Sequence, residues 1–252
     1  MKQYNFFANS TKTVAGYFRD EAAMTFDLLL DWQNNNLILG SCVEMGVWHG
    51  KSAGLIALHS QDTKFHMVDI AANRLHSKIE HTFNLLELSL SDKNYNLHDM
   101  ASQNILQDEQ LSKQYRCSRF IHIDGLHDGP TTYNDIKIAD FLCSEKGIVV
   151  IDDFFSPAFP NVTEAFYRYV SLHPYSFTLF MVGGRKGFLA RPEFVGQYRK
   201  LIYDKLLDYL EENNFEMTLH KHGTDADCYA IGLEWRGKNQ DRYHGLHISN
   251  LG

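Results

Sequence analysis

Hydrophobic and polar positions along the chain form two alternating patterns. Short, almost wholly apolar runs predict buried strands at 37–44, 65–70, 95–98, 119–124 and 147–152. Between these runs, apolar residues at helical spacing predict helices near 50–60, 72–90, 102–115 and 131–143. This alternation is typical of right-handed strand–helix–strand units, so we expect a parallel sheet with helices on both faces.

Further elements flank this core. Apolar residues at helical spacing predict a leading helix over 16–34. Beyond residue 155 the pattern predicts a helix at 161–172, a strand at 177–182, a turn at Gly183-Gly184, a helix at 193–212 and a last strand around Cys228–Leu233. Residues 188–190 fit either a strand or a covering segment. No linker, repeat or low-complexity stretch interrupts the sequence. We therefore expect a single domain over 1–252, with an N-terminal helical cover (1–36), a core (37–155) and a C-terminal part (156–252) that decorates the substrate side.

Composition and charge narrow the class of protein. The 252 residues are 44% hydrophobic and carry a formal net charge of −7, and no basic block is longer than two residues. Nucleic acid and anionic membranes are therefore not expected as partners. The chain has neither an apolar run of about 20 residues nor a signal-peptide centre, and its four cysteines are dispersed. We expect a cytoplasmic protein with reduced cysteines.

Two of the apolar runs end on acids. The run at 119–124 ends at Asp124, and the run at 147–152 ends on the pair Asp152-Asp153. Neighbouring parallel strands open onto one crevice, where three carboxylates would repel one another unless a cation or protons intervene. Because Mg²⁺ prefers oxygen ligands, we predict that these three acids bind a divalent cation. The alternative is that they only cap the segments that follow.

His127 follows Asp124 by three residues in a loop that contains glycine. An imidazole with an ordinary pKa near 6.5 could take a proton from a substrate hydroxyl at this crevice. We predict His127 and Asp124 as the catalytic residues. The alternative for His127 is a capping or supporting hydrogen-bond donor.

The first predicted strand runs into a glycine-containing segment over 44–52. Gly46 and Gly50 permit a tight turn and close approach of a ligand to the backbone. Glu44, however, stands where a dinucleotide-binding motif has its first glycine. A carboxylate fits poorly beside a pyrophosphate and well beside the positive charges of S-adenosylmethionine. The alternative is a plain turn with glycines that pack a helix.

Acids also follow the next two predicted strands. Asp69 could accept hydrogen bonds from ribose hydroxyls or cap the next helix, and Asp99-Met100 could contact an adenine or serve only the loop. The complete set of predicted cofactor-binding residues is Glu44, Gly46, Trp48, Gly50, Ser52, Asp69, Asp99, Met100 and Asp124.

Taken in order, the segments VEMGVWHGKS, MVDI, HIDGLHDG and GIVVIDDF resemble the class I S-adenosylmethionine-dependent methyltransferases. The resemblance is strongest to the metal-assisted branch of small-molecule O-methyltransferases, which includes catechol-type and macrolide-sugar enzymes, and it covers about residues 37–155. It implies a Rossmann-like, doubly wound and mostly parallel sheet of seven strands.

The resemblance also implies roles for the predicted residues. Glu44, Gly46 and Gly50 would line the methionine part of the cofactor, and Asp69 would hold its ribose. The acids Asp124, Asp152 and Asp153 would bind Mg²⁺. Catechol-type enzymes place a lysine base where this chain has His127.

We therefore expect an S-adenosylmethionine-dependent O-methyltransferase that acts, with Mg²⁺, on a hydroxyl of a small molecule such as a sugar diol, a catechol or a natural product. One alternative is an NAD-dependent oxidoreductase, which Glu44 disfavours. Another is a non-methylating relative of the cephalosporin-hydroxylase type that keeps the cofactor pocket. Helices over 1–34 and 193–212 would cover the site and enclose a small acceptor. A homodimer formed through these amphipathic helices is a further possibility that the sequence does not decide.

Overall fold

Five parallel strands form the centre of the fold. In the computed structural model, which describes residues 2–222, 230–238 and 240–244, these strands lie in the order β3-β2-β1-β4-β5. Their bounds are β1 Cys42–Met45, β2 Phe65–Asp69, β3 Tyr95–Asp99, β4 Ser118–Ile123 and β5 Cys143–Ile151. The strand order reverses between β1 and β4, and ligands bind beyond the carboxyl ends of parallel strands at such a point.

The C-terminal third extends the same sheet. Next to β5 the order continues β7-β6-β9-β8-β10, and β7 runs antiparallel to both β5 and β6. The bounds are β6 Thr178–Gly183, β7 Lys186–Ala190, β8 Met217–His222, β9 Ala230–Trp235 and β10 Tyr243–His244. The described residues thus form a mostly parallel sheet of ten strands, and the expected number of seven was wrong. The predicted last strand corresponds to β9, while Cys228 lies outside the described residues.

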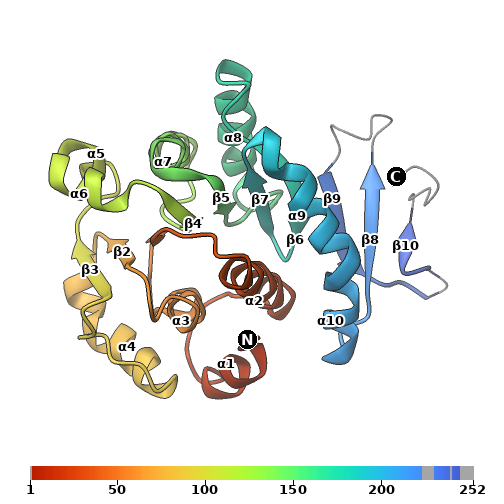
Figure 1. The fold of residues 1–252 in the computed structure, drawn as a ribbon, viewed down its shortest axis with the longest axis horizontal. Coiled ribbons are helices and arrows are strands. Elements are labelled where there is room, and N and C mark those ends of the chain that lie inside the picture. Colours follow the sequence, from red (N-terminus) through yellow and green to blue (C-terminus); the bar gives the residue numbers. More distant parts are fainter. Residues whose placement is uncertain (1, 223–229, 239, 245–252) are drawn as a thin grey trace.

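Helices cover the two faces of the sheet in separate layers (Figure 1). One layer contains α1 Tyr4–Ser10, α2 Asp20–Asn35, α3 Lys51–Leu58, α4 Ala72–Leu85, α9 Val195–Leu201 and α10 Leu207–Glu212. The other contains α5 Asn104–Gln107, α6 Glu109–Tyr115, α7 Gly129–Leu142 and α8 Pro160–Leu172. The doubly wound α/β fold expected from the alternating pattern is therefore confirmed.

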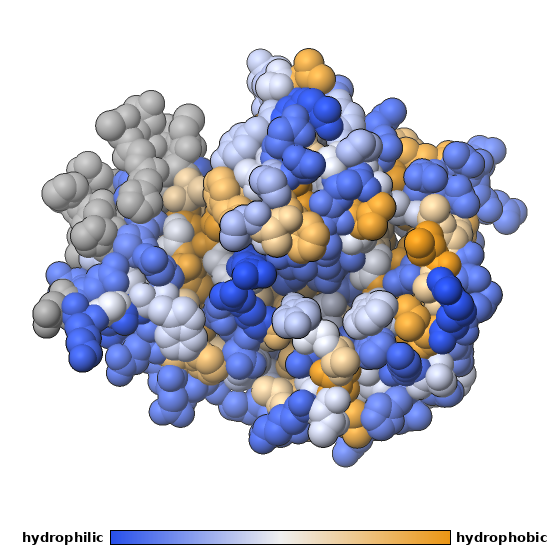
Figure 2. Space-filling view, turned by 180° about the vertical axis from the view of Figure 1, so that it is seen from behind, coloured by the Kyte–Doolittle hydropathy of each residue, from blue (hydrophilic) through white to orange (hydrophobic). Residues whose placement is uncertain are grey.

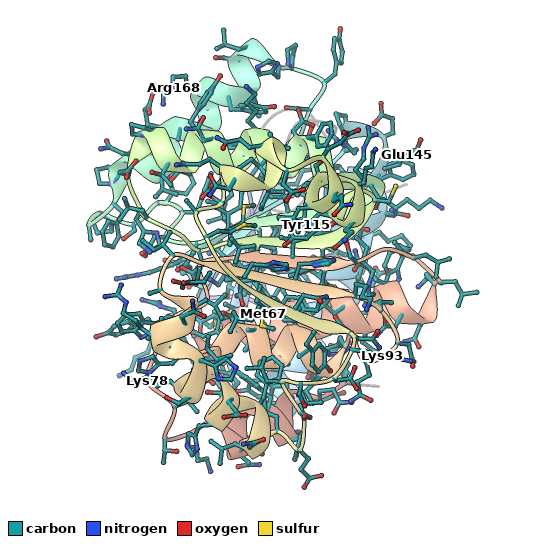
Figure 3. The ribbon with its side chains drawn as sticks, turned by 90° about the vertical axis from the view of Figure 1, so that its left-hand side faces the viewer. Met67, Lys78, Lys93, Tyr115, Glu145 and Arg168 are labelled. Atoms are coloured by element: carbon teal, nitrogen blue, oxygen red, sulfur yellow. The ribbon has the colours of Figure 1, made fainter. Side chains whose placement is uncertain are left out.

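The central strands bury both of their faces. Cys42 packs in the core on the α2 side and Val43 in the core on the α7 side, as the alternation of side chains along a strand requires. Figure 3 shows the sheet between the two helical layers, with Met67 of β2 inside it and Tyr115 of α6 above it. Burial on both faces explains why these strands are nearly continuous apolar runs in the sequence.

Three helical segments differ from the predicted ones. Helix α1 precedes the predicted leading helix, and the segment predicted at 102–115 divides at Asp108, whose carboxylate accepts the N–H groups of Gln110 and Leu111 and so begins α6. The segment predicted at 193–212 consists of the 3₁₀ turn η1 (Pro192–Phe194), α9, a π-helical segment η2 (Ile202–Leu206) and α10.

Helix α2 brings the N-terminal part of the chain over the middle of the sheet. The ring of Phe26 makes edge contacts with the rings of Phe120 and His122 on β4, each 5.1 Å between centroids, and with Phe188 on β7 at 6.0 Å. On the surface seen from behind, apolar patches alternate with hydrophilic side chains (Figure 2). Within the described residues, no helix has both the length and the apolar character needed to cross a membrane.

Candidate active site

The glycine-containing loop after β1 is held close to the loop after β4. Gly46 has a φ of +88°, and a Cβ there would lie 2.0 Å from the backbone oxygen of Asp124. Only glycine permits this approach. Gly50, with a φ of +77°, begins α3, and Ser52 is buried in the first turn of that helix.

Trp48 is the exposed member of this loop. Its φ is +50°, its side chain is 60% exposed, and its ring stacks on that of His49 at 4.8 Å between centroids. A left-handed backbone and an exposed indole are both costly for folding, and such features concentrate at ligand sites.

Asp69, at the end of β2, fixes the conformation of the same loop. Its Oδ2 accepts the backbone N–H groups of Val47 (2.9 Å) and Trp48 (3.1 Å), and its Oδ1 accepts that of Ala71 (2.7 Å). The carboxylate therefore orders the loop, and lone pairs remain on it for a ligand hydroxyl. The structure brings Glu44, Gly46, Trp48, Gly50 and Asp69 together at one edge of the sheet.

The acid after β3 lies beside this group. The Asp99 carboxylate accepts the Asn73 side-chain amide at 2.5 Å, and the Met100 N–H donates to the backbone oxygen of Asp69 at 3.2 Å. Asp99 is exposed, whereas Met100 is partly buried against the core on the α7 side. Their predicted adenine contacts stay predictions.

A chain of buried polar side chains crosses four strands beneath these loops. Glu44 of β1 is fully buried, and its Oε1 lies 2.6 Å from Nδ1 of His122 on β4. The other ring nitrogen of His122 lies 3.0 Å from Nζ of Lys186 on β7, which also lies 2.5 Å from Oδ1 of Asp152 after β5. An ammonium can only donate, so Nε2 of His122 accepts and its Nδ1 carries the proton donated to Glu44.

Charges in and beside this row of polar side chains shift the pKa values of Asp152, Asp124 and Lys186. Burial alone would raise the pKa of Asp152, but the ammonium of Lys186 holds it well below the usual range. Burial and the neighbouring Asp152 raise the pKa of Asp124 well above its usual range. Burial would lower the pKa of Lys186, yet the carboxylates of Asp152 and Asp124 raise it. The site therefore contains an ionised Asp152 paired with an ammonium.

The predicted metal ligands are brought together only in part. Asp124, His127 and Asp152 each offer one atom, and these three atoms lie within 4.8 Å of one another. Asp153 lies beside this group of three, with its carboxylate 3.7 Å from Arg185 and 3.6 Å from Nε2 of His127. Nε2 of His127 also lies 3.8 Å from Oδ1 of Asp124.

From the sequence alone, no role in the site is assigned to Lys186 or to His122. The available signal was a lysine directly before the apolar run GFLA, since a charge at a buried strand position requires a partner. That signal does not identify the partner of the lysine, because the neighbours of β7 depend on where β7 joins the sheet.

Apolar side chains surround the acids on the loops that follow the central strands. Trp48, Ile70, Leu126 and Phe155 are each more than half exposed, and the ring of Phe159 lies 4.7 Å from that of His127. Exposed apolar groups gathered around charged ones are typical of a site that binds an organic molecule. An apolar groove of about 590 Å³ runs from Phe155 between α8, β6 and β9.

Comparisons with known proteins agree with this geometry. Residues 43–154 match a family model described as a methyltransferase domain, and no curated protein sequence matches the chain. Among solved structures, an O-methyltransferase from Bacillus cereus in complex with SAH is 18% identical with a TM-score of 0.51, covering 73% of this chain and 89% of that one. The MycE methyltransferase from the mycinamycin biosynthetic pathway, in complex with Mg and SAH, is 10% identical with a TM-score of 0.54, covering 76% of this chain and 54% of that one.

At these identities the two structures show a shared fold. The matched segment begins at β1 and ends just after Asp153, so it contains the glycine loop, Asp69 and all three acids predicted at the ends of β4 and β5. Residues 43–154 therefore match a methyltransferase domain in sequence, and the two solved methyltransferases share the fold of this chain.

Proposed function

We propose that the protein transfers the methyl group of S-adenosylmethionine to a hydroxyl of a small molecule, with a divalent cation held by Asp124 and Asp152. The observation that carries this proposal is the placement of Asp124, His127 and Asp152 within 4.8 Å of one another, beside a glycine loop whose backbone Asp69 fixes.

Glu44, on β1 just before the glycine loop, fits the cofactor. The second carboxylate oxygen of Glu44, Oε2, is buried and has no hydrogen-bond partner in the described part of the chain. A buried carboxylate oxygen needs a compensating partner, and the cofactor carries an ammonium at its methionine end. The same carboxylate disfavours a pyrophosphate, so the nicotinamide alternative has no support here.

The acids fit a hard cation. Mg²⁺ is usually held by one or two carboxylates and keeps several waters, and Asp124 and Asp152 are 27% and 14% exposed in their side chains. When bound, such a cation lowers the pKa of an acceptor hydroxyl and orients it. MycE, which shares the fold, was solved with Mg.

In this proposal His127 removes the proton of the acceptor. Its Nε2 would take the proton, and the carboxylates of Asp153 and Asp124, 3.6 and 3.8 Å away, would stabilise the imidazolium that forms. The exposed rings of Trp48 and Phe155 would hold the apolar part of the acceptor. The reaction then depends largely on the positions in which these groups hold the two reactants.

Calorimetric titration of the chelator-stripped protein with S-adenosylhomocysteine tests the cofactor part of the proposal. Methyl transfer to catechols and sugar diols, with and without Mg²⁺, tests the rest. We expect saturable binding, transfer that requires the cation, and loss of transfer in Asp124→Asn and Asp152→Asn with cofactor binding retained. Full activity of both variants in chelator would contradict the cation assignment, and no binding by folded protein would contradict the cofactor assignment.

A further inference from the structure

Lys186 is a buried ammonium at the acidic edge of the sheet. Its side chain is 2% exposed, and Nζ lies 2.5 Å from Oδ1 of Asp152. On the α2 side, Nζ lies 5.4 and 5.7 Å from the ring centroids of Phe18 and Phe26. Lys186 occupies the first position of β7, and because β7 runs antiparallel to β5 this position falls at the carboxyl ends of the parallel strands.

The ammonium contacts the same carboxylate that we assign to the cation. Asp152 offers its Oδ1 to Lys186 and also belongs to the group with Asp124 and His127. A second basic side chain near these acids, Arg185, faces Asp153 instead. Lys186 therefore supplies positive charge directly to the acids that would hold a divalent ion.

We propose that Lys186 acts as a permanent counter-ion for the carboxylates of Asp124 and Asp152. Its ammonium holds Asp152 in place and weakens the affinity of the site for divalent cations. This inference rests on the proposed function for its site, but its test separates the two. Two effects favour weakening. The ammonium occupies one oxygen of Asp152, and its charge repels a second cation bound to the same carboxylate.

A purely structural role makes the opposite prediction. If Lys186 only supports the shape of the site, its removal disorders Asp152 and lowers cation affinity, as loss of a supporting contact around a metal ligand usually does. If its charge is the dominant effect, removal raises cation affinity. The direction of the change therefore distinguishes the two roles.

The experiment is a titration of the chelator-stripped protein with Mn²⁺, followed by calorimetry or by the loss of the free-ion electron paramagnetic resonance signal. The variants are Lys186→Met, which is unbranched and only one atom shorter, and Lys186→Gln, which removes the charge but keeps a donor. The matched control is Lys93→Met, because Lys93 is exposed and lies at the opposite edge of the sheet (Figure 3). Melting temperatures of all four proteins establish that each is folded.

We expect at least about tenfold tighter Mn²⁺ binding by the folded Lys186 variants and no change in Lys93→Met. A different result is that the original protein binds no Mn²⁺ and a Lys186 variant does. The ammonium then takes the place of the metal, which supports the counter-ion role and contradicts the cation in the proposed function. Unchanged or weaker binding in Lys186→Gln, with the original protein binding Mn²⁺, overturns the inference and leaves the proposed function intact. Binding by none of the proteins overturns both.

Discussion

His66 on β2 predicts how the stability of this protein responds to acid. The side chain is 2% exposed, its ring centroid lies 4.0 Å from that of Tyr115 on α6, and neither ring nitrogen has a hydrogen-bond partner among the described residues. Burial, with smaller contributions from His98 and Lys64, lowers the pKa of His66 from 6.5 to about 4. The native protein therefore keeps this imidazole neutral where the unfolded chain protonates it.

The sign and size of the effect follow from this difference in pKa. Between pH 6.5 and 4 the unfolded chain binds a proton at His66 that the native state does not, so the stability that His66 contributes is present above pH 6.5 and lost as the pH falls toward 4. One pKa unit corresponds to about 1.4 kcal/mol, so His66 alone lowers the free energy of unfolding by about 3 kcal/mol between pH 7 and 4.

The test replaces His66 by leucine, which has a similar volume and cannot take a proton. Urea denaturation at several pH values between 7 and 4 gives the free energy of unfolding of both proteins. We expect the two curves to diverge, with the original protein losing about 3 kcal/mol more than His66→Leu over this range. The control is His81→Leu, an exposed position on α4, whose curve should parallel that of the original protein. Parallel curves for His66→Leu as well would refute the argument.

Three further substitutions test other parts of the structure. His127→Ala should lower the turnover number about 10²- to 10⁴-fold in methyl-transfer assays while the affinity for S-adenosylhomocysteine stays within about threefold, and an unchanged turnover number would remove this residue from the role of base. Gly46→Ala should weaken S-adenosylhomocysteine binding at least about tenfold by calorimetry, because a Cβ there meets the backbone of Asp124 at 2.0 Å. Gly196→Ala is its control, since a Cβ there meets nothing within 4 Å, and equal binding by both variants would contradict the strain at Gly46. Asp27→Ala should cost about 3–5 kcal/mol in urea denaturation, because its buried carboxylate accepts hydrogen bonds from Gln3 and Tyr209 and pairs with His59; a loss below about 1 kcal/mol would contradict this.

The central half of the fold could be predicted from the sequence because its strands are buried on both faces. The apolar runs ending at Asp69, Asp124 and Asp152 all correspond to strands, and the acids after them lie at one edge of the sheet. Parallel connections leave little freedom in where such residues meet, so the presence of a site followed from the order of the strands.

The C-terminal third was harder to predict because its strands are less uniformly apolar. Strand β8 (MTLHKH) alternates apolar and polar residues, β10 has two residues, and the GFLA segment fits more than one structure. The contact of Lys186 with Asp152 depends on β7 returning antiparallel beside β5, which no local pattern specifies. Asp153 was expected to lie with the other two acids; it stands in the turn after β5 at a φ of +50°, where its carboxylate lies 3.7 Å from Arg185 and 3.6 Å from Nε2 of His127.

The hydrogen bond between Tyr209 and Asp27 joins residues that are 182 positions apart in the sequence. During synthesis, at about 5–20 residues per second, Asp27 leaves the ribosome roughly 10–40 s before its partner exists. Helix α2, whose Phe26 packs on β4 and β7, therefore cannot complete its packing until most of the chain has been made. Its apolar face must meanwhile be protected by non-native collapse or by a chaperone, and the nascent chain is most exposed to aggregation over that interval.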